Sequence, residues 1–408
     1  SIPGKNVVLS VDIKLQYLVE QLYGNFRGAF VAIEPATGDV LAFVSKPNFN
    51  PNDFVEGIDS VTWKELNESK SKPLYNRPLK GIYSPASTYK PFMALAALEL
   101  GMRTPSQSIN DPGFFTLGTH TFRDEKRAGH GIVDMQKSIV ESCDTYYYLL
   151  ARDMGVNAMH DFMKPLGFGQ KTGIDLEGEA TGILPSTAWK KTAFKKPEQQ
   201  KWFEGETISL GIGQGYNTFT MLQLASATAT LASGGIKYKP QLVIATQDAV
   251  SRVKSIVQGS APIDLQYKSE NVAIIHKAVG AVPVEGTSAR AFAGVTYRSG
   301  GKTGTAQAVS IGQKDKYDVR RIEEHLRDHA LYMAFAPLES PQIALAIIVE
   351  NAGFGSEHAA PIARRVFDYV VSGRYPSRED IAAVQEAKAA APLGKPRIAK
   401  DIPWPLAE

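Results

Sequence analysis

The sequence predicts an α/β (α+β) fold in which both ends of the chain contribute to one antiparallel sheet, combined with a helical subdomain. Two β-rich apolar runs lie near the start, at 29–34 and 39–44, and two more near the end, at 330–336 and 343–350. The segment between these regions is dominated by helical patterns. Strands early, helices inserted and strands late are the order expected when distant parts of a chain complete one sheet.

Each pair of runs has the pattern of a hairpin. A Pro-Ala-Thr-Gly turn at 35–38 separates the first two runs, and Pro337 with the Ser340-Pro341 pair separates the later two. The predicted helices end at glycine or at a polar break, as helices commonly do; they cover 12–23, 87–100, 134–142, 145–154, 220–232 and 359–371. The last of these is amphipathic and is expected to cover one face of the sheet.

The chain is expected to form one domain at 1–374, with a mainly helical subdomain at 76–234, followed by a tail at 375–408. The tail is rich in Ala, Pro and Lys and has no apolar periodicity after Leu393, so we expect it to be partly disordered. The segment 190–206 interleaves lysines with Trp and Phe. Because it is short and acidic residues follow it, we interpret it as a solvated surface loop.

Composition excludes several functional classes. The net charge of the 408 residues is only +3, so no nucleic-acid partner is implied. No stretch approaches the roughly 20 apolar residues that cross a bilayer, and residues 1–5 do not resemble a signal peptide. If the natural protein is exported or anchored, we expect the responsible segment to lie outside this chain. A single cysteine, Cys143, excludes an intramolecular disulfide.

The first motif with chemical potential is Ser87-Thr88-Tyr89-Lys90, at the start of a predicted helix. Residues three apart on a helix share a face, so the Ser87 hydroxyl and the Lys90 amine can meet. A serine is a poor nucleophile unless a base activates it, and the helix N-terminus favours a developing anion. Taken alone, Ser-x-x-Lys is more often a capping serine with an unrelated lysine.

The second motif is Ser142-Cys143-Asp144, at the joint between two predicted helices. Its simplest interpretation is a helix N-cap, because Ser and Asp are favoured there. The functional interpretation is that Ser142 points at Lys90 and relays a proton between the nucleophile and a leaving amine.

The third motif is Lys302-Thr303-Gly304-Thr305. On a strand, Gly304 would let a substrate backbone approach, Thr303 would offer a hydroxyl to a carboxylate and Lys302 would supply positive charge. The main-chain N–H of Thr305 could then form an oxyanion hole with that of Ser87. A phosphate-binding loop is excluded, because the position five residues before Gly301 is Thr296 instead of glycine.

Together, and in this order, the three motifs resemble those of the penicillin-recognising serine transferases. The closer resemblance, over nearly the whole chain from Val7 to about Arg374, is to the elongation-type class B penicillin-binding proteins, the penicillin-binding protein 2 group. Asp144 departs from the commoner Ser-x-Asn motif but is familiar in this subgroup. Besides the motifs, the similar stretches are 7–12, 129–131, 141–146, 211–216, 302–307, 326–329 and 335–337.

The resemblance implies a penicillin-binding/transpeptidase fold, with an antiparallel five-stranded sheet covered by helices and an inserted all-helical subdomain within 76–234. It implies a peptidoglycan D,D-transpeptidase that crosslinks stem peptides through an acyl-enzyme on Ser87 during cell-wall elongation and is inhibited by β-lactams. The implied location is the periplasmic face of the inner membrane. The implied partners of the full-length protein are a membrane glycosyltransferase and scaffold proteins of the elongation complex.

Four other residues form a candidate metal site: Asp111, Asp124, His130 and Cys143. Two carboxylates, an imidazole and a thiolate are an acceptable tetrahedral zinc set, but turn aspartates, a histidine between glycines and a packed cysteine explain the same residues. Some members of the resembled subgroup carry zinc at matching places. The resemblance therefore implies a structural zinc, and no cofactor for the chemistry itself.

Two other functions use related motifs. A β-lactamase or carboxypeptidase would pass the acyl group to water, but nothing here resembles a dedicated deacylating glutamate motif, and the chain is long for a β-lactamase. A non-catalytic penicillin sensor would use acylation as a signal, and no signalling module is evident in the sequence. Measuring penicillin turnover distinguishes the β-lactamase or carboxypeptidase from the transpeptidase, since a persistent acyl-enzyme favours the transpeptidase.

Overall fold

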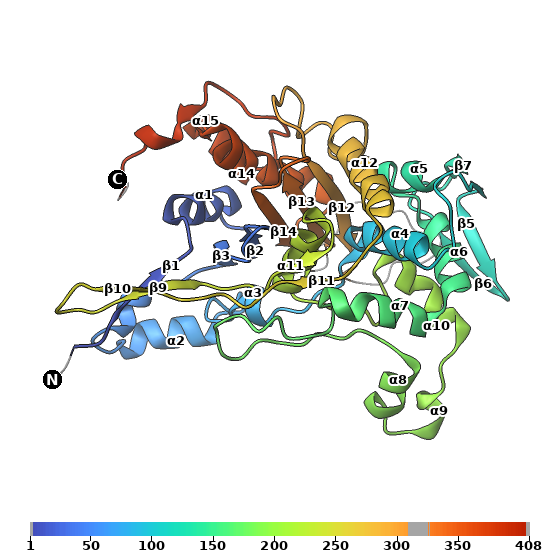
Figure 1. Ribbon diagram of the computed structural model, residues 1–408, viewed down its shortest axis with the longest axis horizontal. Helices are drawn as coiled ribbons and strands as arrows, with labels where there is room; N and C mark the ends of the chain where they lie inside the picture. Colours follow the sequence, from blue (N-terminus) through green and yellow to red (C-terminus); the bar gives the residue numbers. More distant parts are fainter. Residues whose placement is uncertain (1–2, 309–324, 326, 405–408) are drawn as a thin grey trace.

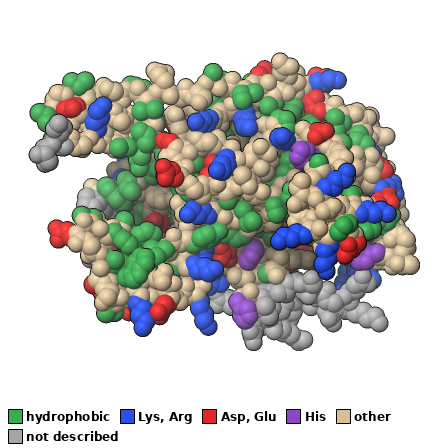
Figure 2. Space-filling model, turned by 90° about the horizontal axis from the view of Figure 1, so that it is seen from below, with side chains coloured by type: hydrophobic (Ala, Val, Ile, Leu, Met, Phe, Trp, Pro, Cys, Tyr) green, Lys and Arg blue, Asp and Glu red, His purple; other side chains and the backbone are tan. Residues whose placement is uncertain are grey.

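The computed structural model describes residues 3–308, 325 and 327–404. Most of the segment 310–327, with Leu326 of the similar stretch at 326–329, lies outside the described residues. None of the helices in the described part of the chain combines the length and the apolar character needed to cross a bilayer. The face shown in Figure 2 mixes basic, acidic and hydrophobic side chains, in keeping with the net charge of +3.

A five-stranded antiparallel sheet forms the centre of the molecule, in the order β12-β13-β14-β2-β3 (Figure 1). Its strands are β2 (Arg27–Ile33), β3 (Val40–Lys46), β12 (Gly300–Ala306), β13 (His329–Ala336) and β14 (Ile343–Glu350). β2 pairs with β14, so the first hairpin joins the last one, as the sequence predicted. Both predicted hairpins and the fold class are confirmed.

Helices cover both faces of this sheet. Side chains alternate across each strand, so Phe30 and Ala32 face one hydrophobic core while Val31 and Ile33 face the other. The first core is covered by α1 (Ile13–Tyr23), α14 (Ala360–Ser372) and α15 (Arg378–Gln385). The second is covered by α4 (Lys90–Glu99), α11 (Met221–Ala232) and α12 (Ser269–Glu285), which lie on the other side of the sheet in Figure 1. α12 was not among the helices predicted from the sequence.

The inserted segment at 76–234 is mainly helical but also contains small sheets. Its remaining helices are α3 (Arg77–Lys80), α5 (Met135–Val140), α6 (Asp144–Met154), α7 (Val156–Met163), α8 (Thr187–Ala193), α9 (Pro197–Gln200) and α10 (Glu204–Ile208). Two two-stranded sheets pair β4 (Ile109–Asp111) with β7 (Gly131–Val133) and β5 (Phe114–Leu117) with β6 (His120–Arg123). The prediction of an all-helical subdomain is therefore wrong for residues 109–133, where runs of three or four residues were too short to signal strands.

Further short elements lie outside the insertion. α2 (Ser60–Glu68) precedes it, and α13 (Gly355–His358) precedes α14. A three-stranded sheet joins β1 (Asn6–Leu9), β9 (Val243–Gln247) and β10 (Lys254–Ile256). The two remaining pairs are β8 (Ile236–Lys237) with β11 (Ile263–Asp264) and β15 (Arg374–Tyr375) with β16 (Arg397–Ile398).

Residues 375–404 of the tail form helices and a strand pair and pack against the rest of the chain, whereas the sequence predicted partial disorder. Ser377 caps α15, and Ile381 and Val384 pack into the core beside α1 and α14. The carboxylate of Asp380 lies 2.7 Å from Nη2 and 3.0 Å from Nε of Arg365, with both side chains 1% exposed. Arg365 lies outside the tail, so the composition of the tail alone did not reveal this ion pair.

Most residues of the segment 190–206 are exposed, as predicted, but Lys190 is buried. The Lys190 amine is 3% exposed and lies 2.5 and 2.6 Å from the two carboxylate oxygens of Glu206. Four aromatic rings surround this amine at 5.1–5.9 Å, those of Phe194, Trp202, Phe203 and Tyr216. Lys190 therefore holds this segment together through cation–π contacts and an ion pair.

Candidate active site

Ser87 lies on a 3₁₀ turn at Ala86–Tyr89 that leads directly into α4. Pro91 at the first turn of α4 costs no helical hydrogen bond. The backbone of Ala86 has a φ of +49°, a conformation that L-residues adopt rarely and at a cost. The turn is supported by Gly213, whose carbonyl accepts a hydrogen bond from Ser84 Oγ at 2.6 Å. A Cβ at Gly213 would lie 2.2 Å from the Ala86 carbonyl oxygen, so only glycine fits there.

Lys90 is fully buried and is directed at the second motif. Its Nζ lies 3.0 Å from Ser142 Oγ, 3.1 Å from the Ser142 carbonyl and 2.6 Å from Asp144 Oδ1. These three acceptors match the three donors of an ammonium group. Among the hydrogen bonds of the described residues, none joins Lys90 to Ser87, the contact that the sequence predicted.

Asp144 acquires a definite place from this geometry. It is the first residue of α6, and its second carboxylate oxygen accepts a hydrogen bond from the main-chain N–H of Glu125 at 3.2 Å. Asp144 therefore connects Lys90 to the loop after β6. Ser142 has a left-handed backbone, with a φ of +58°, which turns the chain between α5 and α6 toward Lys90.

The third motif lies on β12, beside the turn that carries Ser87. An added Cβ at Gly304 would lie 3.1 Å from Thr88 Cγ2 and 3.2 Å from the Pro85 carbonyl oxygen, so the missing side chain permits this close approach. Lys302 is fully buried, and its Nζ donates to the Thr303 carbonyl at 3.0 Å. Burial, and then the nearby charge of Lys90, lower the pKa of Lys302 well below its usual value.

Sequence reasoning missed Thr287, which follows α12. Its hydroxyl lies 2.6 Å from the hydroxyl of Thr303 on β12, so the two residues form a hydrogen-bonded pair. Gly355 was also missed: its N–H lies 3.4 Å from Thr305 Oγ1, and a Cβ there would lie 2.4 Å from the Gly304 carbonyl oxygen. A short Gly-Thr-Ser run at 286–288 was the only signal for Thr287 in the sequence.

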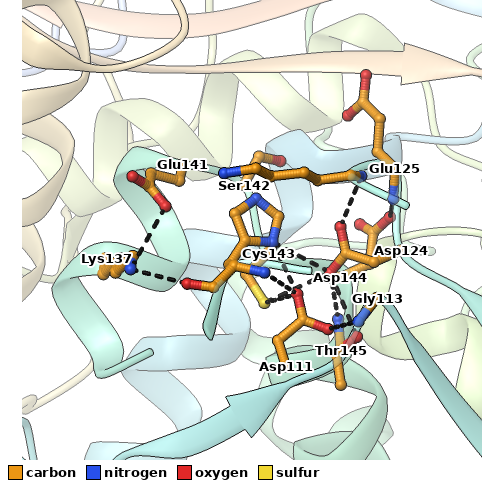
Figure 3. Close-up of polar contacts among 12 residues, drawn as sticks. Asp111, Gly113, Asp124, Glu125, Lys137, Glu141, Ser142, Cys143, Asp144 and Thr145 are labelled. Atoms are coloured by element: carbon orange, nitrogen blue, oxygen red, sulfur yellow. Dashed lines mark hydrogen bonds and ion pairs between the residues drawn. The ribbon is translucent and has the colours of Figure 1, made fainter. Parts of the chain in front are cut away.

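The four candidate metal ligands converge beside the second motif. The ligand atoms of Asp111, Asp124, His130 and Cys143 all lie within 4.8 Å of one another, and all four residues are buried. Figure 3 shows Asp111, Asp124 and Cys143 turned toward one another. Asp111 Oδ2 lies 2.8 Å from His130 Nδ1 and 3.4 Å from Cys143 Sγ, and Asp124 Oδ2 is also 3.4 Å from that sulfur.

This donor set fits zinc. One nitrogen, one sulfur and two carboxylate oxygens are ligands that Zn²⁺ accepts in tetrahedral sites. Without an ion, burial and the two carboxylates raise the pKa of the Cys143 thiol, and burial with the charge of Asp144 raises the pKa of Asp124. A divalent cation would reverse both effects, because it favours the deprotonated ligands.

The four candidate ligands come from separate elements of the chain, so a bound ion would link these elements. Asp111 ends β4, Asp124 follows β6 and His130 precedes β7, whereas Cys143 caps α6 between Ser142 and Asp144. An ion held by all four would tie the Ser142–Asp144 loop to three strands of the insertion.

Comparison with known proteins agrees with this geometry. The family model described as the penicillin binding protein transpeptidase domain matches residues 28–368. The peptidoglycan D,D-transpeptidase MrdA of Acinetobacter baumannii is 43% identical over 371 residues, which are 90% of this chain and 54% of that protein. MrdA of Escherichia coli K12 is 38% identical over 391 residues, 95% of this chain and 61% of that protein. The chain thus spans little more than half the length of these relatives.

Solved structures show the same fold. The crystal structure of Pseudomonas aeruginosa PBP2 in complex with WCK 5153 aligns with a TM-score of 0.80 at 41% identity, covering 90% of this chain and 78% of that one. PBP2 of Helicobacter pylori in its complex with MreC aligns with a TM-score of 0.79 at 30% identity, covering 90% and 64%. The chain therefore belongs to the penicillin-binding protein transpeptidase family.

Proposed function

We propose that this chain is the D,D-transpeptidase region of an enzyme that crosslinks peptidoglycan stem peptides during cell-wall elongation and that β-lactams acylate and inhibit. The observation that carries this proposal is the convergence of three motifs: Lys90 is joined to Ser142 and Asp144, and β12 holds Lys302 beside the turn that carries Ser87. Relatives that span the same region are named peptidoglycan D,D-transpeptidases.

In the proposed first step, Ser87 Oγ attacks the carbonyl carbon of the penultimate D-alanine of a donor stem peptide. Lys90, whose ammonium contacts Ser142 and Asp144 in the free chain, must first lose a proton to solvent. Its neutral amine then accepts the hydroxyl proton, and Ser142 relays this proton to the amine of the terminal D-alanine as the peptide C–N bond breaks. Hydrogen bonds of this kind are often long before substrate binds, so the missing Ser87–Lys90 bond does not oppose the assignment. The main-chain N–H groups of Ser87 and Thr305 are proposed to stabilise the oxyanion.

In the second step, an amine on a neighbouring stem peptide attacks the acyl-enzyme ester. The bond to Ser87 Oγ breaks, the serine recovers a proton, and a new amide joins the two stems. A β-lactam mimics the donor and stops at the acyl stage. No cofactor takes part in either step.

Lys302 and Thr303 are proposed to bind the carboxylate of the terminal D-alanine. Burial and the positive charge of the Lys90 ammonium lower the pKa of Lys302, so they disfavour a charge on the Lys302 amine. An incoming carboxylate would restore the charge, because an opposite charge nearby favours the ionised form. The Thr287–Thr303 pair would orient the hydroxyl that donates to the same carboxylate.

The cluster of Asp111, Asp124, His130 and Cys143 is proposed to hold a structural zinc. Such an ion would have a structural role and would supply no chemistry to the acyl transfer. It would fix the loop on which Ser142 and Asp144 meet Lys90.

The proposed location is the periplasmic face of the inner membrane, where stem peptides are crosslinked. The full-length protein is proposed to work with a membrane glycosyltransferase and with scaffold proteins of the elongation complex. Two similar structures support the proposed partners, since one is described as PBP2 in complex with MreC and the other as a peptidoglycan synthase complex.

A fluorescent penicillin tests the nucleophile and the class of reaction. The chain should be labelled covalently on Ser87, the label should be absent in Ser87→Ala, and the exposed-serine control Ser106→Ala should label normally. A label that persists for hours, with a donor thioester converted to an amide when a D-amino acid is supplied, supports the transpeptidase. Rapid loss of the label with multiple turnover of penicillin would assign a β-lactamase instead.

A further inference from the structure

A cavity of about 710 Å³ opens at the end of the central sheet, where β13 begins and β14 ends. Its volume lies in the usual range for small-molecule sites. The loop between α2 and α3 closes one side, and the segment leading to the Ser87 turn closes another. The side chains used below are among its lining residues: Arg27, Lys70, Lys72, Arg77, Tyr83 and Glu350.

The charges around this cavity do not balance. Among the described lining residues, four are Lys or Arg and one, Glu350, is acidic. Arg27 and Arg77 lie 3.8 and 2.7 Å from its carboxylate. Glu350 Oε1 accepts hydrogen bonds from Arg77 Nε at 2.7 Å and from the Tyr83 hydroxyl at 2.6 Å, so its charge is matched within the wall. Among the described residues, no carboxylate pairs with the exposed amines of Lys70 or Lys72. Lys70 and Lys72 therefore give the described part of the lining an excess of positive charge.

The loop that presents the two lysines is held by a buried arginine. Arg77 is 5% exposed, and besides Glu350 its guanidinium donates to the carbonyls of Ser71 at 2.7 Å and Lys72 at 3.2 Å. Arginine can serve several acceptors at once because its donors form a rigid planar fork. The backbone between Lys70 and Lys72 is thus attached to the end of the sheet.

The cavity continues the path of β12 away from the catalytic turn. Ala306, the last residue of β12, pairs with His329, which lines the cavity. Tyr83 precedes Ser87 by only four residues, and its ring lies 5.9 Å from that of His329, edge to face. A donor peptide with its terminal carboxylate at Lys302 and its reacting carbonyl at Thr305 would continue past Ala306. At about 3.3 Å per extended residue, the next few residues would reach the cavity.

We propose that this cavity binds a carboxylate of the donor peptide, carried about one to three residues upstream of the D-alanine that Ser87 attacks. Lys70 and Lys72 supply the ammonium groups, and Arg77 holds their loop in place. The inference rests on the proposed function, and it makes the chain selective for donors that are anionic at this position.

Two matched donors test the proposal in the whole 408-residue chain. Both are D-alanyl thioesters, and they differ only in one upstream residue, which is a γ-linked glutamate with a free carboxylate in one and its amide in the other. We expect wild type to use the carboxylate donor about tenfold better in kcat/KM at low salt, with roughly two- to fivefold from each lysine. The Lys70→Gln/Lys72→Gln variant should lose this preference and keep its rate with the amide donor.

Controls separate this inference from the proposed function. Lys64→Gln/Lys171→Gln removes two exposed lysines outside the cavity and should keep the full preference. If penicillin labels Ser87 but wild type does not discriminate the donors, or both double variants lose discrimination equally, the cavity inference is overturned while the function stands. If penicillin does not label Ser87, the proposed function fails and this inference fails with it.

Discussion

Replacing Gly304 by alanine adds a single methyl group, which should slow acylation but cost little stability. In Gly304→Ala the new Cβ would lie 3.1 Å from Thr88 Cγ2 and 3.2 Å from the Pro85 carbonyl oxygen. Because carbon atoms pack best at 3.5–4.0 Å, β12 and the Ser87 turn must move apart by about 0.4 Å. Oxyanion donors act within a window of about 2.7–3.1 Å, so this shift removes most of the permitted range.

We expect acylation by a fluorescent penicillin to slow about tenfold, or ~1.4 kcal/mol in the transition state, because a 1 Å misplacement costs about a hundredfold. Thermal unfolding followed by circular dichroism should show a loss of only about 1 kcal/mol, the low end for an overpacked site. Gly205→Ala is the matched control, since a Cβ added there would meet no atom within 4 Å beyond its chain neighbours and the backbone of its own helix. Acylation of Gly304→Ala at the wild-type rate would refute the close approach of β12 to the turn.

Three further predictions concern charge. Cys143→Ala should abolish binding of about one zinc per chain, and a chelator should lower the melting temperature of wild type but not of the variant; equal responses contradict a metal at Cys143. In Ser87→Ala, a D-Ala-D-Ala peptide should bind with proton uptake, measured by calorimetry in buffers of different ionisation enthalpy. The pKa of Lys302 is lowered in the free protein, and the bound carboxylate should raise it. Peptide affinity should therefore fall as the pH rises from the pKa of Lys302 in the free protein to its pKa in the complex. Binding without proton exchange would exclude this role of Lys302. Asp380→Ala should cost about 3–5 kcal/mol in urea unfolding, because it leaves Arg365 buried without its carboxylate, and a loss below about 1 kcal/mol would mean that the tail is loosely held.

The hairpins and most predicted helices follow from local signals. Turn residues at 35–38 separate runs that are β-rich on both sides, and Asp12, Asp134 and Thr220 each cap a helix that begins at the next residue. Such signals act over a few residues, so they can be recognised without a tertiary structure.

The burial of two charged residues, Arg365 and Lys190, was missed. The tail orders around Arg365, and Lys190 is buried by aromatic side chains from its own segment and by Tyr216. The composition of the tail had indicated partial disorder, and the short run at 190–206, followed by acidic residues, had indicated a solvated loop. Burial with a partner reverses that inference, because a paired charge can be accommodated in a core where a lone one cannot.

For the site, the sequence by itself predicted which residues would carry the chemistry. The order and spacing of the motifs singled out Ser87, Lys90, Ser142 and Lys302, since each motif is a short local pattern. Only the tertiary structure decided that Lys90 contacts Ser142 and Asp144, that Thr287 pairs with Thr303, and that a basic cavity continues β12. These contacts join side chains 16 or more residues apart, and folding alone sets such distances.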